Sequence, residues 1–221
     1  MVKVKKLTIL NFLGFVITSI LVMCNYTKKF DNAFANFMKI YKNHLLKKSA
    51  NILAVIASPK KILLISLILI SFISIILLIF NKWNKINNIS DNLKLLLFTI
   101  LIAYFSNDVL KNLFKRARPS VKVISKVDKY SFPSDHSMMA FAFFITIAYI
   151  LCQYIQSKSI KFIICFLSIF MTILIGLSRV YLGKHFMTDI IGGYFLSGFI
   201  LCFLIWIICS ISKYSINEQK I

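Results

Sequence analysis

Charged residues are scarce in this sequence, and acidic residues are scarcest of all. Only 15% of the 221 residues are charged, 59% are hydrophobic, and the mean hydropathy is +0.81. A soluble domain averages about 45–50% apolar and about 25% charged residues. The composition therefore excludes an ordinary soluble protein and predicts an integral membrane protein with a single domain over residues 1–221.

The sequence also lacks the cysteine spacing of a metal or disulfide site. Its five cysteines lie in or at the ends of apolar segments, where we expect them to serve as small hydrophobic residues: Cys24, Cys152, Cys165, Cys202 and Cys209. No other cluster of ligand residues points to a metal, so we predict neither a metal nor another cofactor.

Basic residues outnumber acidic ones by 27 to 7, which gives a net charge of +20. They lie in short runs between apolar segments, a pattern that favours membrane lipids and phosphorylated substrates, rather than nucleic acid, as partners. Only three of them are arginines: Arg116, Arg118 and Arg179. In a chain so rich in lysine, we expect each arginine to be needed as an arginine.

Six apolar runs are each about long enough to span a bilayer: Leu7–Cys24, Ile62–Phe80, Leu93–Leu110, Ser137–Tyr154, Ile160–Leu177 and Phe186–Ser210. Residues 25–61 differ, because aromatic residues recur there at helical spacing with the lysines mostly off that stripe. This pattern indicates an amphipathic helix in the headgroup region, or else a solvated helix packed on the protein. We expect Asp31 to cap that helix, and Gly193, Ser197 and Gly198 to allow close packing of the sixth span.

The predicted fold is therefore all-α. We expect a polytopic membrane protein with six transmembrane helices, one amphipathic interfacial helix, and both termini on the same side of the membrane.

Three polar stretches lie at the ends of these spans, and one of them is Ser178–Asp189, which reads S-R-x5-H-x3-D. His185 and Asp189 are four residues apart, so on a helix the carboxylate can reach the imidazole and leave the other ring nitrogen free to react. Arg179 adds a planar fork of donors suited to phosphate oxygens. Taken alone, the stretch is also compatible with an incidental polar turn between two helices.

The second stretch is basic and reads K-x6-R-P where the chain leaves the third span. Lys111, Lys115 and Arg118 would form one cationic stripe, although a basic run at a helix end is usually a snorkelling anchor.

The third stretch, Pro133-Ser134-Asp135-His136, opens the fourth span. Ser134 is an expected N-cap, and the first-turn N–H groups suit an anion. The alternative is a capping serine with an incidental histidine. Because two spans separate the 111–133 loop from the 178–185 loop, the stretches must share one membrane face, where ionisable residues indicate a functional site.

The three motifs, in this order over residues 111–189, resemble the tripartite signature of the type 2 phosphatidic acid phosphatase superfamily, which also contains vanadium haloperoxidases. The resemblance implies that His185 attacks phosphorus and forms a phosphohistidine, that Asp189 orients it, and that His136 protonates the leaving oxygen and then activates water. It implies phosphate binding by Lys111, Arg118, Ser134, Asp135 (through its backbone N–H) and Arg179. Asp135 is a departure, because the family most often has Gly there, and we expect its carboxylate to face a Lys or Arg.

The predicted function is metal-independent hydrolysis of a lipid phosphate or diphosphate. Undecaprenyl diphosphate is the preferred substrate, because the P-S-D-H variant resembles that branch and because further cations share the face: Lys115, Arg116, Lys122, Lys126, Lys129 and Lys184. Phosphatidylglycerophosphate, phosphatidic acid and a lipid A phosphate are the alternative substrates. A haloperoxidase is disfavoured by the six spans, and a non-catalytic protein that binds lipid phosphates is disfavoured by the two histidines with Asp189.

The resemblance also implies an active site on the extracytoplasmic face of the cell membrane. That orientation puts 10 of the 27 Lys and Arg residues inside and 17 outside, whereas the positive-inside rule prefers the reverse. We retain the outward site because many of the outer cations would bind phosphate or lipid headgroups.

Overall fold

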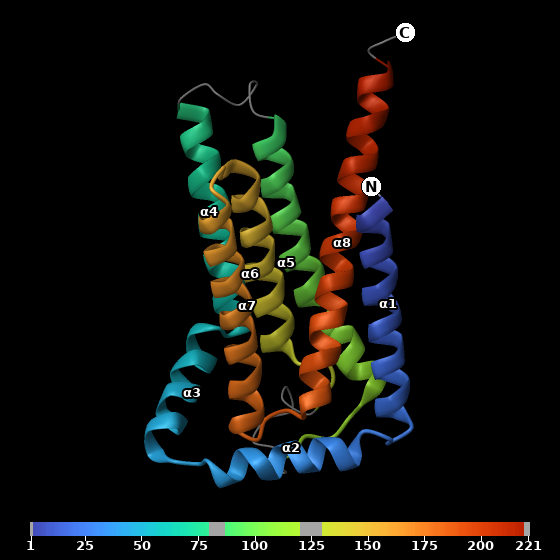
Figure 1. Ribbon diagram of the computed structural model, residues 1–221, viewed down its shortest axis with the longest axis vertical. Helices are drawn as coiled ribbons and strands as arrows, with labels where there is room; N and C mark the ends of the chain where they lie inside the picture. The colour runs from blue at the N-terminus through green and yellow to red at the C-terminus, as the bar shows by residue number, and fades with distance from the viewer. Residues whose placement is uncertain (1, 80–86, 120–129, 219–221) are drawn as a thin grey trace.

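The computed structural model describes residues 2–79, 87–119 and 130–218, and every regular element in these ranges is an α-helix (Figure 1). Six of the helices are long and apolar enough to cross a membrane: α1 (Val2–Met23), α4 (Pro59–Ile79), α5 (Asn87–Phe114), α6 (Asp135–Tyr154), α7 (Lys158–Tyr181) and α8 (Met187–Glu218). The all-α fold class and the six predicted spans are confirmed, with bounds that shift by several residues.

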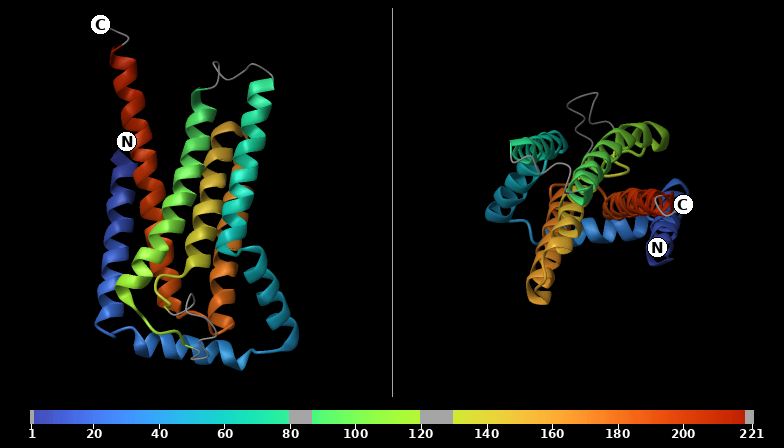
Figure 2. Two further views of the ribbon diagram at one scale, coloured as in Figure 1. Left: turned by 180° about the vertical axis from the view of Figure 1, so that it is seen from behind. Right: turned by 90° about the horizontal axis from the view of Figure 1, so that it is seen from above.

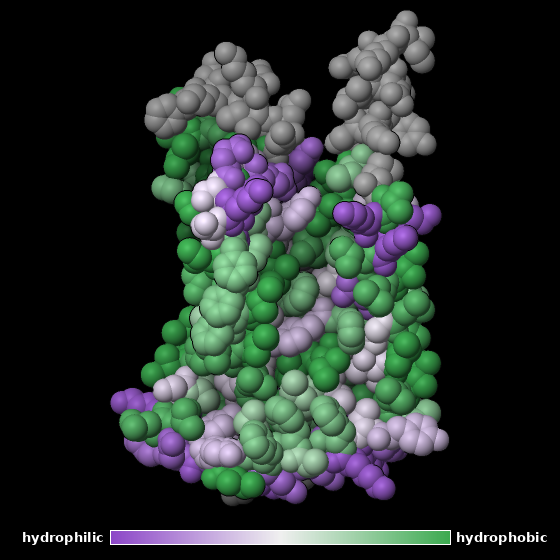
Figure 3. Space-filling view, viewed as in Figure 1, coloured by the Kyte–Doolittle hydropathy of each residue, from purple (hydrophilic) through white to green (hydrophobic). Residues whose placement is uncertain are grey.

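The six long helices form a bundle, and α2 (Lys28–Ile40) crosses one end of it (Figures 1 and 2). Apolar side chains cover the flank of the bundle between more polar bands near its two ends (Figure 3). Large outward side chains such as Phe162 and Phe166 on α7 are exposed, as expected for contact with lipid tails. Helix α1 begins and α8 ends away from α2, so both lead to the same side of the membrane, as predicted (Figure 1).

The segment between the first two spans forms two helices rather than the single interfacial helix that we predicted. Helix α2 ends at Ile40, and α3 (His44–Ile56) begins after Asn43. The Asn43 side chain caps α3 by accepting a hydrogen bond from the Leu46 N–H at 2.7 Å. A capping asparagine favours a new helix start, and the apolar spacing, which runs on from Tyr41 to Leu45, does not reveal the break.

The predicted aromatic stripe is present on α2. Neighbouring ring centroids lie 5.0 to 6.3 Å apart along Phe30, Phe34, Phe37 and Tyr41. Phe30, Phe37 and Tyr41 are at least half exposed, which suits a helix that lies in the headgroup region.

Small residues on α8 bring it close to α1 and α6, as predicted. A Cβ on Gly198 would lie 2.4 Å from the side-chain oxygen of Asn11, and one on Gly193 would lie 3.2 Å from the Ser134 carbonyl oxygen. Ser197 donates a hydrogen bond to the Met138 carbonyl at 3.0 Å. The close approach at Gly193 sets the start of α8 against the start of α6, where two of the polar stretches lie.

Candidate active site

The three polar stretches meet at the end of the bundle that α2 crosses (Figure 1). The Ser134 N–H donates to the Asp189 carbonyl at 3.1 Å, which joins the starts of α6 and α8 directly. Arg118, in the chain that leaves α5, donates to the Lys184 carbonyl at 3.1 Å. The prediction that the stretches share one face is confirmed.

His185 lies in the loop before α8 and is only 1% exposed. Its Nδ1 lies 2.9 Å from the Ser131 carbonyl oxygen and 3.5 Å from Asp189 Oδ2. A carbonyl oxygen can only accept, so Nδ1 carries the proton and Nε2 keeps its lone pair. The predicted pairing with Asp189 is present, but Ser131 is the nearer acceptor. Together they fix the tautomer that an attacking Nε2 requires.

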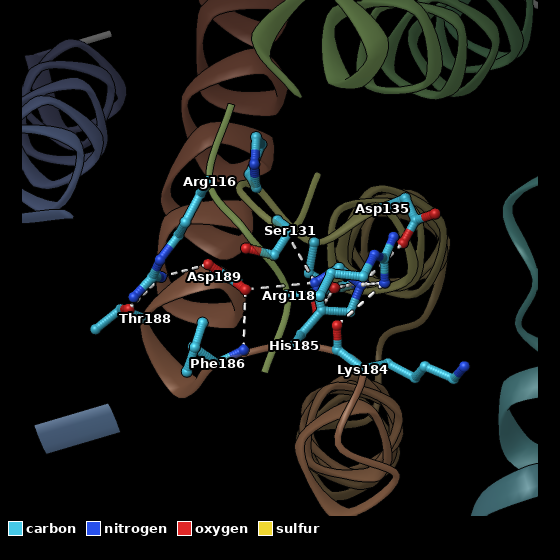
Figure 4. Close-up of polar contacts among 12 residues, drawn as sticks. Arg116, Arg118, Ser131, Asp135, Lys184, His185, Phe186, Thr188 and Asp189 are labelled. Atoms are coloured by element: carbon cyan, nitrogen blue, oxygen red, sulfur yellow. Dashed lines mark hydrogen bonds and ion pairs between the residues drawn. The ribbon is translucent and has the colours of Figure 1, made fainter. Parts of the chain in front are cut away.

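The reactive nitrogen of His185 faces Arg118 and Asp135. Its Nε2 lies 3.3 Å from an Arg118 guanidinium nitrogen and 3.5 Å from Asp135 Oδ1. Figure 4 shows the ring between Asp189 on one side and Asp135 on the other. A phosphoryl group that reached Nε2 would therefore meet a guanidinium suited to hold its oxygens.

The carboxylate of Asp135 lies at the centre of the site. Its Oδ1 is 3.0 Å from His136 Nδ1 and 3.5 Å from His185 Nε2, and its Oδ2 is 3.4 Å from Lys111 Nζ. As predicted, it faces a lysine, but it also contacts both histidines, which the sequence did not indicate. A single carboxylate oxygen therefore lies against both predicted catalytic rings.

His136 is 8% exposed, and α3 holds its second nitrogen. His136 Nε2 lies 3.2 Å from the carbonyl oxygen of Ala54. A carbonyl oxygen can only accept, so Nε2 carries a proton, and Nδ1, beside Asp135, is the nitrogen that can take up and release one. Helix α3 thus helps to orient the predicted acid.

Ser134 and Arg179 have structural contacts beside the site. Ser134 is fully buried and caps α6, since its Oγ accepts from the Ser137 N–H at 3.5 Å and from the Ser137 hydroxyl at 3.0 Å. Arg179, in the last turn of α7, is near enough to His136 for their charges to interact. Its carbonyl accepts from the Lys184 N–H at 3.0 Å, which closes the turn before His185. Phosphate binding by Ser134 and Arg179 remains a prediction.

The prediction that Arg116 adds positive charge to an open face of the active site is wrong. Its side chain is 13% exposed, and its guanidinium donates to Asp189 Oδ1 at 2.5 Å and to Asp31 Oδ2 at 2.6 Å. Two carboxylates neutralise the cation, which leaves little charge to attract a substrate. Of the other cations assigned to that face, Lys115 and Lys184 are exposed, and three lie outside the described residues: Lys122, Lys126 and Lys129.

The prediction that Asp31 caps the interfacial helix is also wrong. Thr27 occupies the N-cap position of α2, and the Asp31 carboxylate, 1% exposed, turns into the protein. There it forms an ion pair with Arg116. Hydrogen bonds between charged groups are about twice as strong as neutral ones, which explains why this pair prevails over capping.

Asn107, on α5, supports the loop that leads into α6 and the site. It is 3% exposed, and its Nδ2 donates to the Pro133 carbonyl at 3.1 Å. This bond holds the loop that leads into Ser134 and His136. A polar residue one turn before Lys111 is the only signal of this role in the sequence.

Two cavities reach the site from different sides. One of about 280 Å³ lies between α4 and α5 and is lined by Tyr104, Lys111 and Asp135. Another of about 330 Å³ lies beside α2 and is lined by Arg118 and His185. Charged side chains line part of both cavities, so either one suits a phosphorylated headgroup or water. Within the described ranges, no three His, Cys, Asp or Glu side chains gather as metal ligands.

Comparisons with known proteins agree with this geometry. A family model described as the PAP2 superfamily matches residues 92–212. Phosphatidylglycerophosphatase B of Bacillus subtilis (strain 168) is 41% identical over 101 residues, which cover 45% of this chain and 49% of that relative. The chain therefore matches about half the length of this curated relative.

Two solved structures are similar over more of the chain. The first is a transmembrane PAP2-type phosphatidylglycerolphosphate phosphatase from Bacillus subtilis, with a TM-score of 0.73 and 27% identity, which covers 92% of this chain and 96% of that one. The second is LpxE from Aquifex aeolicus, with a TM-score of 0.53 and 25% identity, which covers 79% of this chain and 93% of that one.

Proposed function

Because the chain belongs to the PAP2 superfamily, we propose that it is an integral-membrane lipid phosphatase that works through a phosphohistidine intermediate. The family match spans more than half of the chain and includes all three polar stretches. The six candidate spans put the site at one end of a membrane bundle, within reach of a lipid headgroup.

The observation that carries this proposal is the carboxylate oxygen shared by the two histidines. Asp135 Oδ1 lies within 3.5 Å of both His185 Nε2 and His136 Nδ1, and Lys111 lies beside the same carboxylate. In the substrate complex, a phosphoryl group takes this position and the Asp135 side chain turns aside, since two anions in contact repel each other.

The reaction then runs in two steps. Nε2 of His185 attacks phosphorus as the bond to the leaving oxygen breaks, and His136 gives its Nδ1 proton to that oxygen. Asp189 and the Ser131 carbonyl stabilise the positive charge that develops at Nδ1 of His185. His136 next takes a proton from water, which attacks phosphorus and releases inorganic phosphate, and both histidines are restored.

Fixed cations supply the charge stabilisation in this scheme. Lys111, Arg118 and Arg179 offset the charge on the phosphoryl oxygens, as such clamps do in other phosphoryl transfers. The scheme therefore requires no metal ion.

We propose phosphatidylglycerophosphate as the first substrate to consider. The curated relative and the solved structure with the higher TM-score both carry the name of that activity. Undecaprenyl diphosphate is the second candidate, because Asp135 replaces the usual Gly of the second motif. Its electrostatic support is weaker than the sequence suggested, since Arg116 is paired inside the protein.

Turnover on four lipids tests this assignment. With purified protein in one detergent at fixed salt, phosphatidylglycerophosphate should have a kcat/KM at least about tenfold above phosphatidic acid, a lipid A phosphate and undecaprenyl diphosphate, a gap of about 1.4 kcal/mol. EDTA in a parallel set should leave the rates unchanged. If undecaprenyl diphosphate wins by that margin, the second candidate replaces the first, and a loss of activity with EDTA contradicts the metal-free scheme.

We also propose that the site faces away from the cytoplasm. Cys24 tests this, because it is exposed just after α1 at the end of the bundle that carries the site. A membrane-impermeant maleimide should label it in intact cells, and Cys24→Ser should lose that label. Labelling that requires permeabilised membranes would place the site in the cytoplasm, as the positive-inside rule prefers.

A further inference from the structure

Asp31 is the one buried residue of α2, although that helix is amphipathic. Such a helix normally packs through apolar side chains, yet the most deeply buried side chain here is a carboxylate. Burial of a carboxylate is costly unless it is paired and hydrogen-bonded. Replacing a buried ion pair by apolar residues is often neutral or stabilising. Stability alone therefore does not account for Asp31, and its contacts suggest another role.

A continuous series of contacts leads from Asp31 to His185. Asp31 Oδ2 accepts from one Arg116 guanidinium nitrogen at 2.6 Å, and the other donates to Asp189 Oδ1 at 2.5 Å. The second oxygen of Asp189 lies 3.5 Å from His185 Nδ1. Figure 4 shows Arg116, Asp189 and His185 in this order.

Thr188 ties the same groups together a second time. Its N–H donates to Asp31 at 3.0 Å and its hydroxyl donates to Asp31 at 2.7 Å, while the hydroxyl oxygen accepts from Arg116 at 2.8 Å. Because Thr188 directly precedes Asp189, these bonds fix the first turn of α8 against α2.

Arg116 also supports the second acceptor of His185. Its carbonyl accepts from the Ser131 N–H at 2.8 Å, and the Ser131 carbonyl is the nearest acceptor for His185 Nδ1. Both groups that face this nitrogen therefore depend on Arg116, one through its side chain and the other through its backbone.

The charges of this group explain why Asp31 is needed. Arg116 alone would cancel the charge of Asp189, the carboxylate that must stabilise a developing imidazolium. With Asp31 included, the group keeps one net negative charge beside His185. We infer that Asp31 and Arg116 are positioning residues for the nucleophile and that α2 is part of the catalytic machinery, an inference that rests on the proposed function.

A double-mutant cycle with the full-length chain in detergent tests this inference, with phosphatidylglycerophosphate as substrate. Asp31→Asn keeps the shape of the side chain but removes its charge. It should lower kcat by about 10–100-fold, the range that is typical when a metal-bound histidine loses its outer partner, and leave KM within about twofold. In the Asp189→Asn background, the same change should cost less than about twofold, because residues that act as a unit are not additive. Asp91→Asn, which removes an exposed carboxylate on α5, is the charge control and should match the wild type.

The outcomes separate this inference from the function on which it rests. If the wild-type protein releases no phosphate from any lipid, the proposed function fails. If the wild type is active but the two substitutions have fully multiplicative effects on kcat, Asp31 does not act through Asp189 and the inference is overturned. If Asp31→Asn does not fold, Thr188→Val decides, since it deletes only the bridging hydroxyl. It should lower kcat several-fold and leave KM within about twofold, and unchanged kcat would overturn the inference.

Discussion

Replacement of His185 by alanine should reduce phosphate release to background, because it removes the atom that attacks phosphorus. Loss of acid–base help alone costs about 100–10,000-fold, and the loss of the nucleophile should exceed that range. Lys111 and Arg118 remain in place, so the variant should still bind vanadate or inorganic phosphate. The measurement is kcat on phosphatidylglycerophosphate, with vanadate affinity as the check that the pocket is intact.

The third histidine of the chain is the matched control for this prediction. His44 is the first residue of α3 and is exposed, so His44→Ala should retain wild-type turnover. Rapid quenching of the wild type with radiolabelled substrate should trap a phosphoenzyme that is labile to acid and stable to base, and His185→Ala should form none. If His185→Ala keeps more than about 1% of wild-type kcat, a loss that missing acid–base help alone would explain, another group is the nucleophile.

The overall fold could be predicted because the physics that sets it leaves a strong pattern in the sequence. Each bilayer-length apolar run becomes a helix, since a backbone in lipid must satisfy its own hydrogen bonds. Small residues spaced along one face of α8 likewise mark its close contacts with α1 and α6. The sequence did not reveal the break between α2 and α3, because the apolar spacing runs on from Tyr41 to Leu45 and the only sign of a new helix start is the single capping residue Asn43.

The reacting groups of the site could be predicted from ordered motifs, but the groups that hold them could not. The second acceptor of His185 is a backbone carbonyl at Ser131, and the partner of His136 is another at Ala54. Every residue has a carbonyl, so no residue type signals such a role.

Arg116 shows a different limit of prediction from sequence. Its rarity among lysines indicated that an arginine was needed, and that expectation agrees with its two-sided contact with Asp31 and Asp189. Its place in a basic loop nevertheless suggested an exposed cation. The partner that buries it lies 85 positions earlier in the sequence, so only the folded chain reveals the pair.

Replacement of His136 by glutamine should have the second-largest effect, and the effect should depend on the leaving group. A lipid alcohol must be protonated as it departs, so we expect kcat on phosphatidylglycerophosphate to fall by about 100–10,000-fold. A nitrophenolate leaves without a proton, so transfer of phosphate from p-nitrophenyl phosphate to His185 should be largely spared. The measurement is the burst of nitrophenol that precedes steady-state turnover.

The same substitution should also slow the second step, because His136 activates the water that hydrolyses the phosphohistidine. On p-nitrophenyl phosphate, the variant should therefore accumulate phosphoenzyme close to one equivalent, whereas the wild type should not. Arg118→Lys is the matched control, since a guanidinium that holds the phosphoryl oxygens serves both substrates and its loss should slow both by a similar factor. Equal losses on both substrates for His136→Gln, with no phosphoenzyme build-up, would show that His136 shapes the pocket without transferring a proton.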